Sequence, residues 1–214
     1  MSKPRYNFEK LDKTFVEREF QLERVDGHAL LAQWEAGTSP DAIDDKFGIL
    51  NQQRLLLGNR LEDINEETLK MNYISLVLNL VQFNGANYTA FADEKLEAEF
   101  DNFILTGRVD WFVAKGKYKP ETPYLFLQEY KRTKRAASDP EGQLLAEMLT
   151  ARKLDSTIQP MKGLTITGKF WNFVILDENQ YCIGKSYDST QEDELRDIYR
   201  ILKVVKNEIA AKFI

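Results

Sequence analysis

Charged side chains stand inside two apolar segments, where a buried strand would carry apolar residues. The segment GRVDWFVA (107–114) contains Asp110, and the segment YLFLQEYK (124–131) ends with Glu129 and Lys131. Glu129 and Lys131 are two positions apart, so on a strand their side chains leave the same face. Two charges on an otherwise apolar face cost free energy unless they have partners.

These residue types predict a metal site built on a sheet. If the two segments pair as neighbouring strands, Asp110 comes to lie beside Glu129. Two carboxylates at one point form a site for a hard divalent cation, and we expect Mg²⁺ or Mn²⁺ as the cofactor. A protonated Lys131 cannot ligate a metal, but it can position an attacking water or stabilise charge that develops at phosphorus. The alternative is an ion-pair cluster on the surface of an edge hairpin.

Positive charge is concentrated on the same stretch of chain. Residues 107–135 carry eight basic side chains and three acidic ones, whereas the whole chain has a net charge of -5. The chain is therefore not a globally basic nucleic-acid binder, but local positive charge can hold a phosphate backbone. We predict DNA as the partner, with phosphate contacts made by Arg108, Lys115, Lys117, Arg132, Lys134 and Arg135. For the last three, a solvated loop is the alternative.

The composition excludes several other classes of site. The chain has one cysteine, Cys182, and one histidine, His28, so neither an intramolecular disulfide nor a Cys/His zinc site is expected. No glycine-rich phosphate loop of the Walker or dinucleotide type is present. No apolar run reaches about 18 residues, and the first residues do not resemble a signal peptide. We therefore expect a soluble cytoplasmic protein with no membrane partner.

A helix is predicted at 65–83, where apolar residues recur at helical spacing to form one wide face. At about 100° per residue, Glu66 projects near the middle of that face and Glu67 toward its edge. A carboxylate at this point could reach into a site under the helix N-terminus. The plainer interpretation is that both acids only favour the helix dipole.

The remaining elements predict the α/β class. Residues 1–60 have the pattern of a polar helical arm, and residues 61–214 that of one domain. In that domain two strands precede the Glu129 segment, and a helix at 139–154 begins after it with Asp139 and Pro140. Strands within 163–188 follow, with a turn near Glu178 and Asn179, and then an amphipathic helix that opens with the capping-box-like STQED. This order predicts a mixed central sheet flanked by helices.

Asp110 followed by Glu129-Tyr130-Lys131, in this order of elements, resembles the PD-(D/E)XK nuclease superfamily, which has the restriction-endonuclease-like fold. The resemblance covers about residues 60 to 190. GRVDWFV and the threonine-glycine-x-x-tryptophan strand within 163–188 are most similar to the N-terminal nuclease domain of type I restriction R subunits and its stand-alone relatives. Val109 stands where many members have proline.

The resemblance implies roles for five residues. Asp110 and Glu129 would bind the metal, Lys131 would be the catalytic lysine, and Glu66 would be the helix acid, with Glu67 as the alternative. Gln143 resembles a glutamine that several of these nucleases carry on the helix after the lysine. A polar residue in the first turn of a helix is also ordinary without any such role.

The first functional hypothesis is a divalent-metal-dependent nuclease that hydrolyses phosphodiester bonds in DNA. The second is a catalytically silent module of the same fold that binds nucleic acid or a protein partner, and the third is a purely structural role in a larger assembly. The helical arm and the dimeric habit of related nucleases also lead us to expect a homo-oligomer. Trp111 and Trp171 are expected in the core rather than as platforms for base stacking.

Overall fold

The computed structural model describes residues 2–36, 45–61, 63–131, 139–157 and 159–212. Within these residues eight strands form a single sheet. The strands are β1 (Arg5–Asn7), β2 (Glu23–Arg24), β3 (Tyr88–Glu99), β4 (Ile104–Lys115), β5 (Glu121–Lys131), β6 (Met161–Thr167), β7 (Phe170–Asp177) and β8 (Gln180–Asp188).

The sheet is mixed, as the sequence predicts. Its order is β1-β4-β5-β6-β7-β8-β2, and β3 pairs with β4 along the other side of that strand. β5 and β6 are parallel neighbours, whereas β4 and β5 are antiparallel. Parallel neighbours need a crossover connection, and helix α6 (Pro140–Leu154) lies between β5 and β6 in the chain. The strand that carries Glu129 and Lys131 thus sits in the middle of the sheet.

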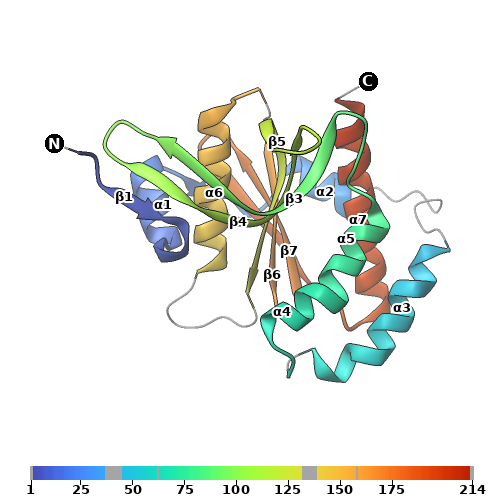
Figure 1. Ribbon diagram of the computed structural model, residues 1–214. Coiled ribbons are helices and arrows are strands. Elements are labelled where there is room, and N and C mark those ends of the chain that lie inside the picture. Colours follow the sequence, from blue (N-terminus) through green and yellow to red (C-terminus); the bar gives the residue numbers. More distant parts are fainter. Residues whose placement is uncertain (1, 37–44, 62, 132–138, 158, 213–214) are drawn as a thin grey trace.

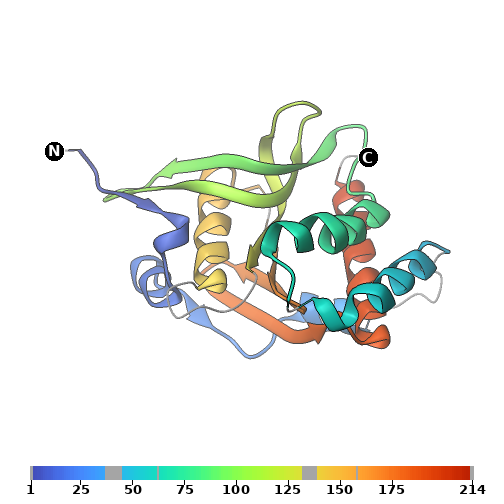
Figure 2. The ribbon, with the colours of Figure 1, turned by 60° about the horizontal axis from the view of Figure 1, so that its bottom comes forward.

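Helices flank the sheet on both sides (Figures 1 and 2). α6 lies on one side together with η1 (Phe8–Lys10) and the short α1 (Lys13–Phe20), and the remaining helices lie on the other. The other helical elements are η1 (Phe8–Lys10), α1 (Lys13–Phe20), α2 (Ala29–Ala36), α3 (Lys46–Leu57), η3 (Gly58–Arg60), α4 (Glu66–Leu69), η4 (Lys70–Ile74), α5 (Ser75–Val81) and α7 (Glu192–Ala211). The α/β class with a mixed sheet flanked by helices is therefore confirmed.

Helix α6 is buried on almost every side. It begins as predicted: the Asp139 side chain accepts a hydrogen bond from the Gly142 amide, and Pro140 follows at the first helical position. Nearly all of its residues from Pro140 to Ala151 are buried, because β5 and β6 cover one side and α1 and η1 another. Polar side chains on this helix must therefore find partners inside the protein.

The predicted helix at 65–83 is confirmed, with one irregularity. Asn65 caps its start by accepting a hydrogen bond from the Thr68 amide. α4 and α5 follow, but the five residues of η4 between them have π-helical geometry. A single π-helical turn inside an α-helix is rare and is often found at functional sites. η4 places Lys70 beside the residues described below as the candidate site.

The first 60 residues contain the expected helices and also two strands that the sequence pattern did not indicate. β1 extends the sheet by pairing with β4, and β2 does so by pairing with β8. Phe8, Val16 and Trp34 are buried in the same hydrophobic core as the rest of the chain. Strands of two or three residues are too short to show a period of two, so the sequence alone carried no signal for them.

The C-terminal third follows the predicted pattern closely. β7 ends at Asp177 and β8 begins at Gln180, so the turn falls on Glu178 and Asn179. α7 begins without the predicted capping box, because Gln191 is the N-cap and makes no side-chain capping bond. Glu194 instead accepts a hydrogen bond from the Asp188 amide. Among the described residues, no helix is both long and apolar enough to cross a membrane.

Candidate functional site

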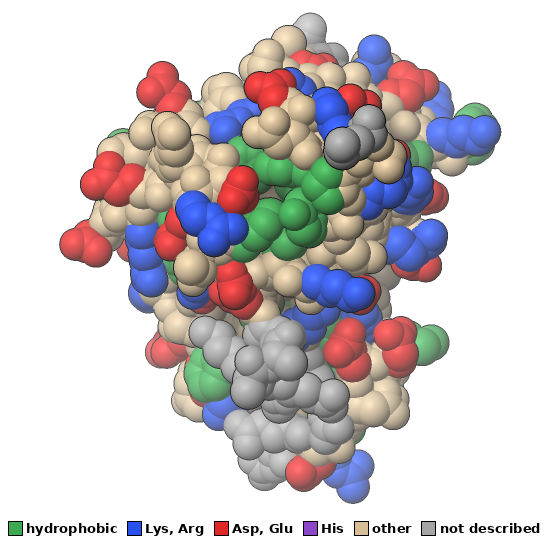
Figure 3. Space-filling model, turned by 90° about the vertical axis from the view of Figure 1, so that its left-hand side faces the viewer, with side chains coloured by type: hydrophobic (Ala, Val, Ile, Leu, Met, Phe, Trp, Pro, Cys, Tyr) green, Lys and Arg blue, Asp and Glu red, His purple; other side chains and the backbone are tan. Residues whose placement is uncertain are grey.

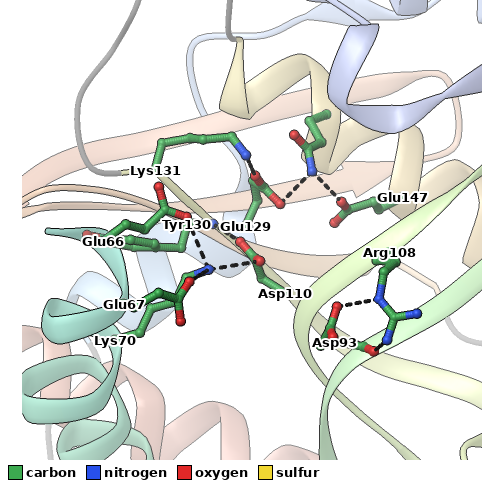
Figure 4. A network of polar contacts seen from close by, with 11 residues as sticks. Glu66, Glu67, Lys70, Asp93, Arg108, Asp110, Glu129, Tyr130, Lys131 and Glu147 are labelled. Atoms are coloured by element: carbon green, nitrogen blue, oxygen red, sulfur yellow. Dashed lines mark hydrogen bonds and ion pairs between the residues drawn. The ribbon is translucent and has the colours of Figure 1, made fainter.

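The register of β4 and β5 brings Asp110 next to Glu129. Trp111 pairs with Gln128, which is the last regular pair before the two strands separate. Beyond it, Asp110 Oδ2 accepts a hydrogen bond of 3.0 Å from the Tyr130 amide. The carboxylate thus bridges the two strands where the backbone ladder ends, as Figure 4 shows.

Glu129 is fully buried, with 0% of its side chain exposed, and it has two partners. Its Oε1 lies 2.7 Å from Lys131 Nζ, so the predicted shared face of these two residues is confirmed. Its Oε2 accepts a hydrogen bond of 2.8 Å from Gln143 Nε2 on α6. The carboxylate is therefore held from two sides, by the next residue of its own strand face and by the crossover helix.

A second buried carboxyl group lies behind Glu129. Gln143 Nε2 also donates to Glu147 Oε1 at 3.1 Å, one turn further along α6. Glu147 is fully buried, and its Oε2 has no hydrogen-bond partner among the described residues. One amide group therefore joins two carboxyl groups away from solvent, in the chain Glu129–Gln143–Glu147; Figure 4 labels the two glutamates.

Lys70 of η4 faces the site from the opposite direction. Its Nζ lies 3.2 Å from Asp110 Oδ1 and 3.1 Å from Glu66 Oε1. Glu67 is further away, at 3.7 Å, and its side chain is 78% exposed compared with 37% for Glu66. Glu66 is thus connected to Asp110 through Lys70, whereas Glu67 is turned mainly toward solvent.

Burial and neighbouring charges shift the protonation equilibria of these groups. Burial and the charge of Asp110 raise the pKa of Glu129 to about 8, although Lys131 acts in the opposite direction. Burial and the charge of Glu129 raise the pKa of Glu147 well above its ordinary value. Burial by itself would lower the pKa of Lys131, but the negative charges of Glu129 and Asp110 outweigh it and the pKa is raised.

Lys70 follows the same pattern as Lys131. Burial acts to lower its pKa, and the charges of Asp110 and Glu66 reverse this effect and raise it. Its ammonium group also lies 5.3 Å from the centre of the Tyr130 ring. The site thus holds two ammonium groups, one on each side of its carboxylates.

The predicted phosphate-binding residues do not gather around this site. Arg108 is exposed and is ion-paired with Asp93 on β3. Lys115 and Lys117 are exposed at the far end of β4 and in the loop after it; Lys115 is five residues, or roughly 17 Å, from Asp110 at the usual rise of a strand. Arg132, Lys134 and Arg135 lie outside the described residues.

The surface seen from the left-hand side of Figure 1 carries charges of both signs (Figure 3). Hydrophobic side chains gather in a hollow near its centre, and Lys, Arg, Asp and Glu side chains are interspersed around it. On this face the described residues form no continuous basic patch. The positive charge nearest to the carboxylates comes from Lys70 and Lys131 instead.

Two residues of the site were not predicted from the sequence. Lys70 follows Glu66 by four positions, and Glu147 follows Gln143 by four positions. Residues four apart on a helix are neighbours on its surface, so each could have been found as the helical neighbour of a residue already chosen.

The site offers carboxylate oxygens, which are the ligands that hard metal ions prefer. Among the described residues, no three His, Cys, Asp or Glu side chains lie close enough together to hold a metal ion. Mg²⁺ is usually bound through only one or two carboxylates together with water and substrate phosphates. Asp110 and Glu129 supply two such carboxylates, so in number and in chemistry they fit a magnesium site.

The arrangement combines paired carboxylates, two partly buried ammonium groups and a glutamine that holds one carboxylate in place. Such a set can hold a cation against an anionic substrate and can stabilise negative charge as it develops. No protein-family model matches the chain, and no curated protein matches it.

Proposed function

We propose that this protein is a divalent-metal-dependent nuclease that hydrolyses phosphodiester bonds in DNA. The observation that carries this proposal is the convergence of Asp110, Glu129 and Lys131 at the point where β4 and β5 separate. These are the residues on which the sequence resembles the PD-(D/E)XK nucleases. We accordingly assign the sheet, with its β5–α6–β6 crossover, to the restriction-endonuclease-like fold.

Asp110 and Glu129 would hold the cation. When bound, the cation would act as a Lewis acid on a phosphate and would lower the pKa of a coordinated water. The Tyr130 amide fixes Asp110, and Gln143 fixes Glu129, so neither carboxylate is free to rotate away. Such outer partners commonly decide how well a site binds its metal.

Lys131 would act on the substrate as a hydrogen-bond donor. Its Nζ is 2.7 Å from Glu129 Oε1, so it would lie next to a phosphate bound to a cation that Glu129 holds. An ammonium group there stabilises negative charge on the phosphate oxygens in the transition state. Lys70, on the other side of Asp110, would contribute in the same way to binding the anionic backbone.

One observation favours the alternative function, a silent module of the same fold that binds nucleic acid or a protein partner. Both oxygens of Asp110 and both oxygens of Glu129 already have a nitrogen partner in the protein. A cation would have to compete with Lys70 and Lys131 for these oxygens. In a nuclease, the cation would displace the two ammonium groups from these oxygens when DNA is present. In a silent binding module, the ammonium groups would keep them.

The test is DNA cleavage by the purified full chain. Plasmid and single-stranded DNA are incubated with Mg²⁺, with Mn²⁺ and with a chelator. We expect cleavage that requires the cation and that falls by about 10²–10³-fold in Lys131→Ala and at least as much in Asp110→Asn. Lys185→Ala and Asp197→Asn are matched controls, because they alter an ion pair on α7 and β8 away from the site.

Cleavage that persists undiminished in Asp110→Asn and Lys131→Ala would show that the reaction occurs elsewhere. If no DNA is cut under any condition but DNA is still bound, the binding module is the correct function. Folding of each variant is checked by its thermal unfolding, so that loss of structure is not mistaken for loss of a catalytic group.

A further inference from the structure

A pocket of about 340 Å³ lies directly beside the candidate site. The helical segment from Lys70 to Asn79 forms one wall, and β3, β4 and β5 form the other. The lining residues at the site end are Lys70 and Asp110, so whatever occupies the pocket touches the groups that we assign to the reaction. Its volume is within the range typical of small-ligand sites.

The walls of the pocket are mainly apolar, and one of them is a flat ring. Met71, Ile74, Leu78 and Ala92 contribute aliphatic surface. Trp111, which the sequence placed in the core, is only partly buried and lines the pocket. Its ring packs edge-to-face with Phe83, with ring centres 5.3 Å apart. A planar aromatic ligand can stack on such a surface.

The inner wall also carries an amide group with an unmet hydrogen bond. Gln128 lines the pocket and is only 2% exposed, and its Oε1 has no hydrogen-bond partner among the described residues. A buried carbonyl oxygen without a partner costs free energy, because it has lost its water and gained nothing in exchange. A ligand with a hydrogen-bond donor on the edge of a ring would satisfy it.

We infer that this pocket receives the base of an unpaired nucleotide in the DNA strand held at the site. A nucleotide is an anion at one end and a planar heteroaromatic ring at the other. Lys70 and Lys131 lie where the phosphate would be, and Trp111 and Gln128 lie where the ring would be. The inference rests on the proposed function, and it adds that the substrate is single-stranded or has a base turned out of the duplex.

The test compares binding of strands that differ only in their bases. A single strand of thymidine nucleotides and an abasic strand of equal length carry the same phosphate charge. Binding is measured for the full chain by fluorescence anisotropy, in the presence of chelator and again with Mg²⁺. We expect the abasic strand to bind at least about 5-fold more weakly, as stacking of one base accounts for such a difference.

Two variants act on the pocket alone. Ala92→Trp fills the pocket from an exposed position on β3, and Gln128→Leu removes the amide while keeping similar volume. Asn72→Trp is the control, because it adds the same ring to an exposed position of η4 that does not line the pocket. We expect the first two to reduce the preference for thymidine over abasic strands and the third to leave it unchanged.

Equal affinity for both strands would overturn the inference, and so would an unchanged preference in both pocket variants. These results are distinguishable from failure of the proposed function. If metal-dependent cleavage is unchanged in the pocket variants, the result contradicts the pocket inference but not the proposed nuclease function. Base-dependent binding without cleavage supports the pocket and contradicts the nuclease.

Gln128→Leu removes an unsatisfied polar atom, so the thermal stability of this variant should not fall. Weaker binding of DNA by this variant is then attributable to the pocket.

Discussion

At the scale of single residues, the site is organised around burial of charge. Glu129 has no exposed surface and burial raises its pKa to about 8, so its ionised form requires partners close by. Lys131 supplies charge and Gln143 supplies a neutral donor. Gln143 also serves Glu147, so one side chain supports two buried carboxyl groups. Removal of the Gln143 amide should therefore lower the stability of the protein as well as its function.

We predict that Gln143→Leu lowers the free energy of unfolding by about 1–3 kcal/mol, the usual cost of leaving buried polar groups without a partner. Leucine is close in size, so the loss comes from the hydrogen bonds rather than from a cavity. Urea denaturation measures it. Gln52→Leu on α3, where the side chain is exposed, should change stability by no more than about 0.5 kcal/mol. An unchanged stability in Gln143→Leu would mean that the amide does not support either carboxyl group.

We also predict that Lys70→Met tightens the binding of Mg²⁺ or Mn²⁺. The Lys70 ammonium lies 3.2 Å from Asp110 Oδ1 and competes with a cation for that carboxylate. For a half-buried pair the gain should be about 1 kcal/mol, or roughly fivefold in affinity. Isothermal titration calorimetry measures it, and Lys185→Met is the control at an exposed ion pair. Weaker binding in Lys70→Met would show that Lys70 supports the cation instead of competing with it.

At the scale of elements, the position of α6 depends on a close contact with the N-terminal segment. The Lys13 amide donates to Asp139 Oδ2 at 2.9 Å, so the starts of α1 and α6 are tied together. A Cβ atom on Gly142 would lie 2.5 Å from the backbone carbon of Asp12 and the backbone nitrogen of Lys13. Only glycine allows this approach. Because α6 carries Gln143 and Glu147, the contact also fixes the depth of these side chains in the core.

We predict that Gly142→Ala destabilises the fold by about 1–3 kcal/mol, because backbone atoms must move to admit the methyl group. Intrinsic helix propensity alone would favour alanine by about 1 kcal/mol. Gly48→Ala is a matched control: Gly48 is also the third residue of its helix, α3, and its added Cβ would have no atom of the described residues within 4 Å, apart from its chain neighbours and the backbone of its own helix. That variant should be stabilised or unchanged. Thermal unfolding distinguishes the two, and equal shifts in both variants would contradict the close contact.

At the scale of the whole molecule, the first 60 residues share one core with the rest. Trp34 of α2 is fully buried, its ring centre lies 5.9 Å from that of Phe173 on β7, and its Nε1 donates to Glu208 of α7 at 2.9 Å. β1 and β2 extend the same sheet at separate places. Because residues 1–60 depend on this shared core and sheet, we do not expect them to stay folded when the sheet unfolds.

We therefore predict that residues 1–60 and 61–214 unfold together. Two variants are compared in urea by tryptophan fluorescence: one retains only Trp34, and the other retains only Trp171, with phenylalanine at the remaining positions. The two transitions should coincide, as in a two-state protein. A separate, earlier transition reported by Trp34 would show that the N-terminal part is an independent unit.

The sequence by itself determined the long elements and the main contact of the site. The helix before β3, the strands β3 to β8 and the start of α6 follow from period, caps and breakers acting within a few residues. The shared face of Glu129 and Lys131 follows from the period of a strand, and the nearness of Asp110 follows from antiparallel pairing of adjacent segments. All of these are local consequences of chain geometry.

Only the tertiary structure decided what surrounds these residues. Lys70 reaches Asp110 because η4 and β4 pack together, and Glu147 meets Glu129 only because α6 crosses the sheet at that depth. β1 and β2 are too short to show the two-residue period of a strand, and they form because longer strands offer them an edge to pair with. The pocket beside Trp111 likewise arises where a helix and three strands meet. Contacts between residues far apart in the chain depend on packing, and packing leaves no local pattern in the sequence.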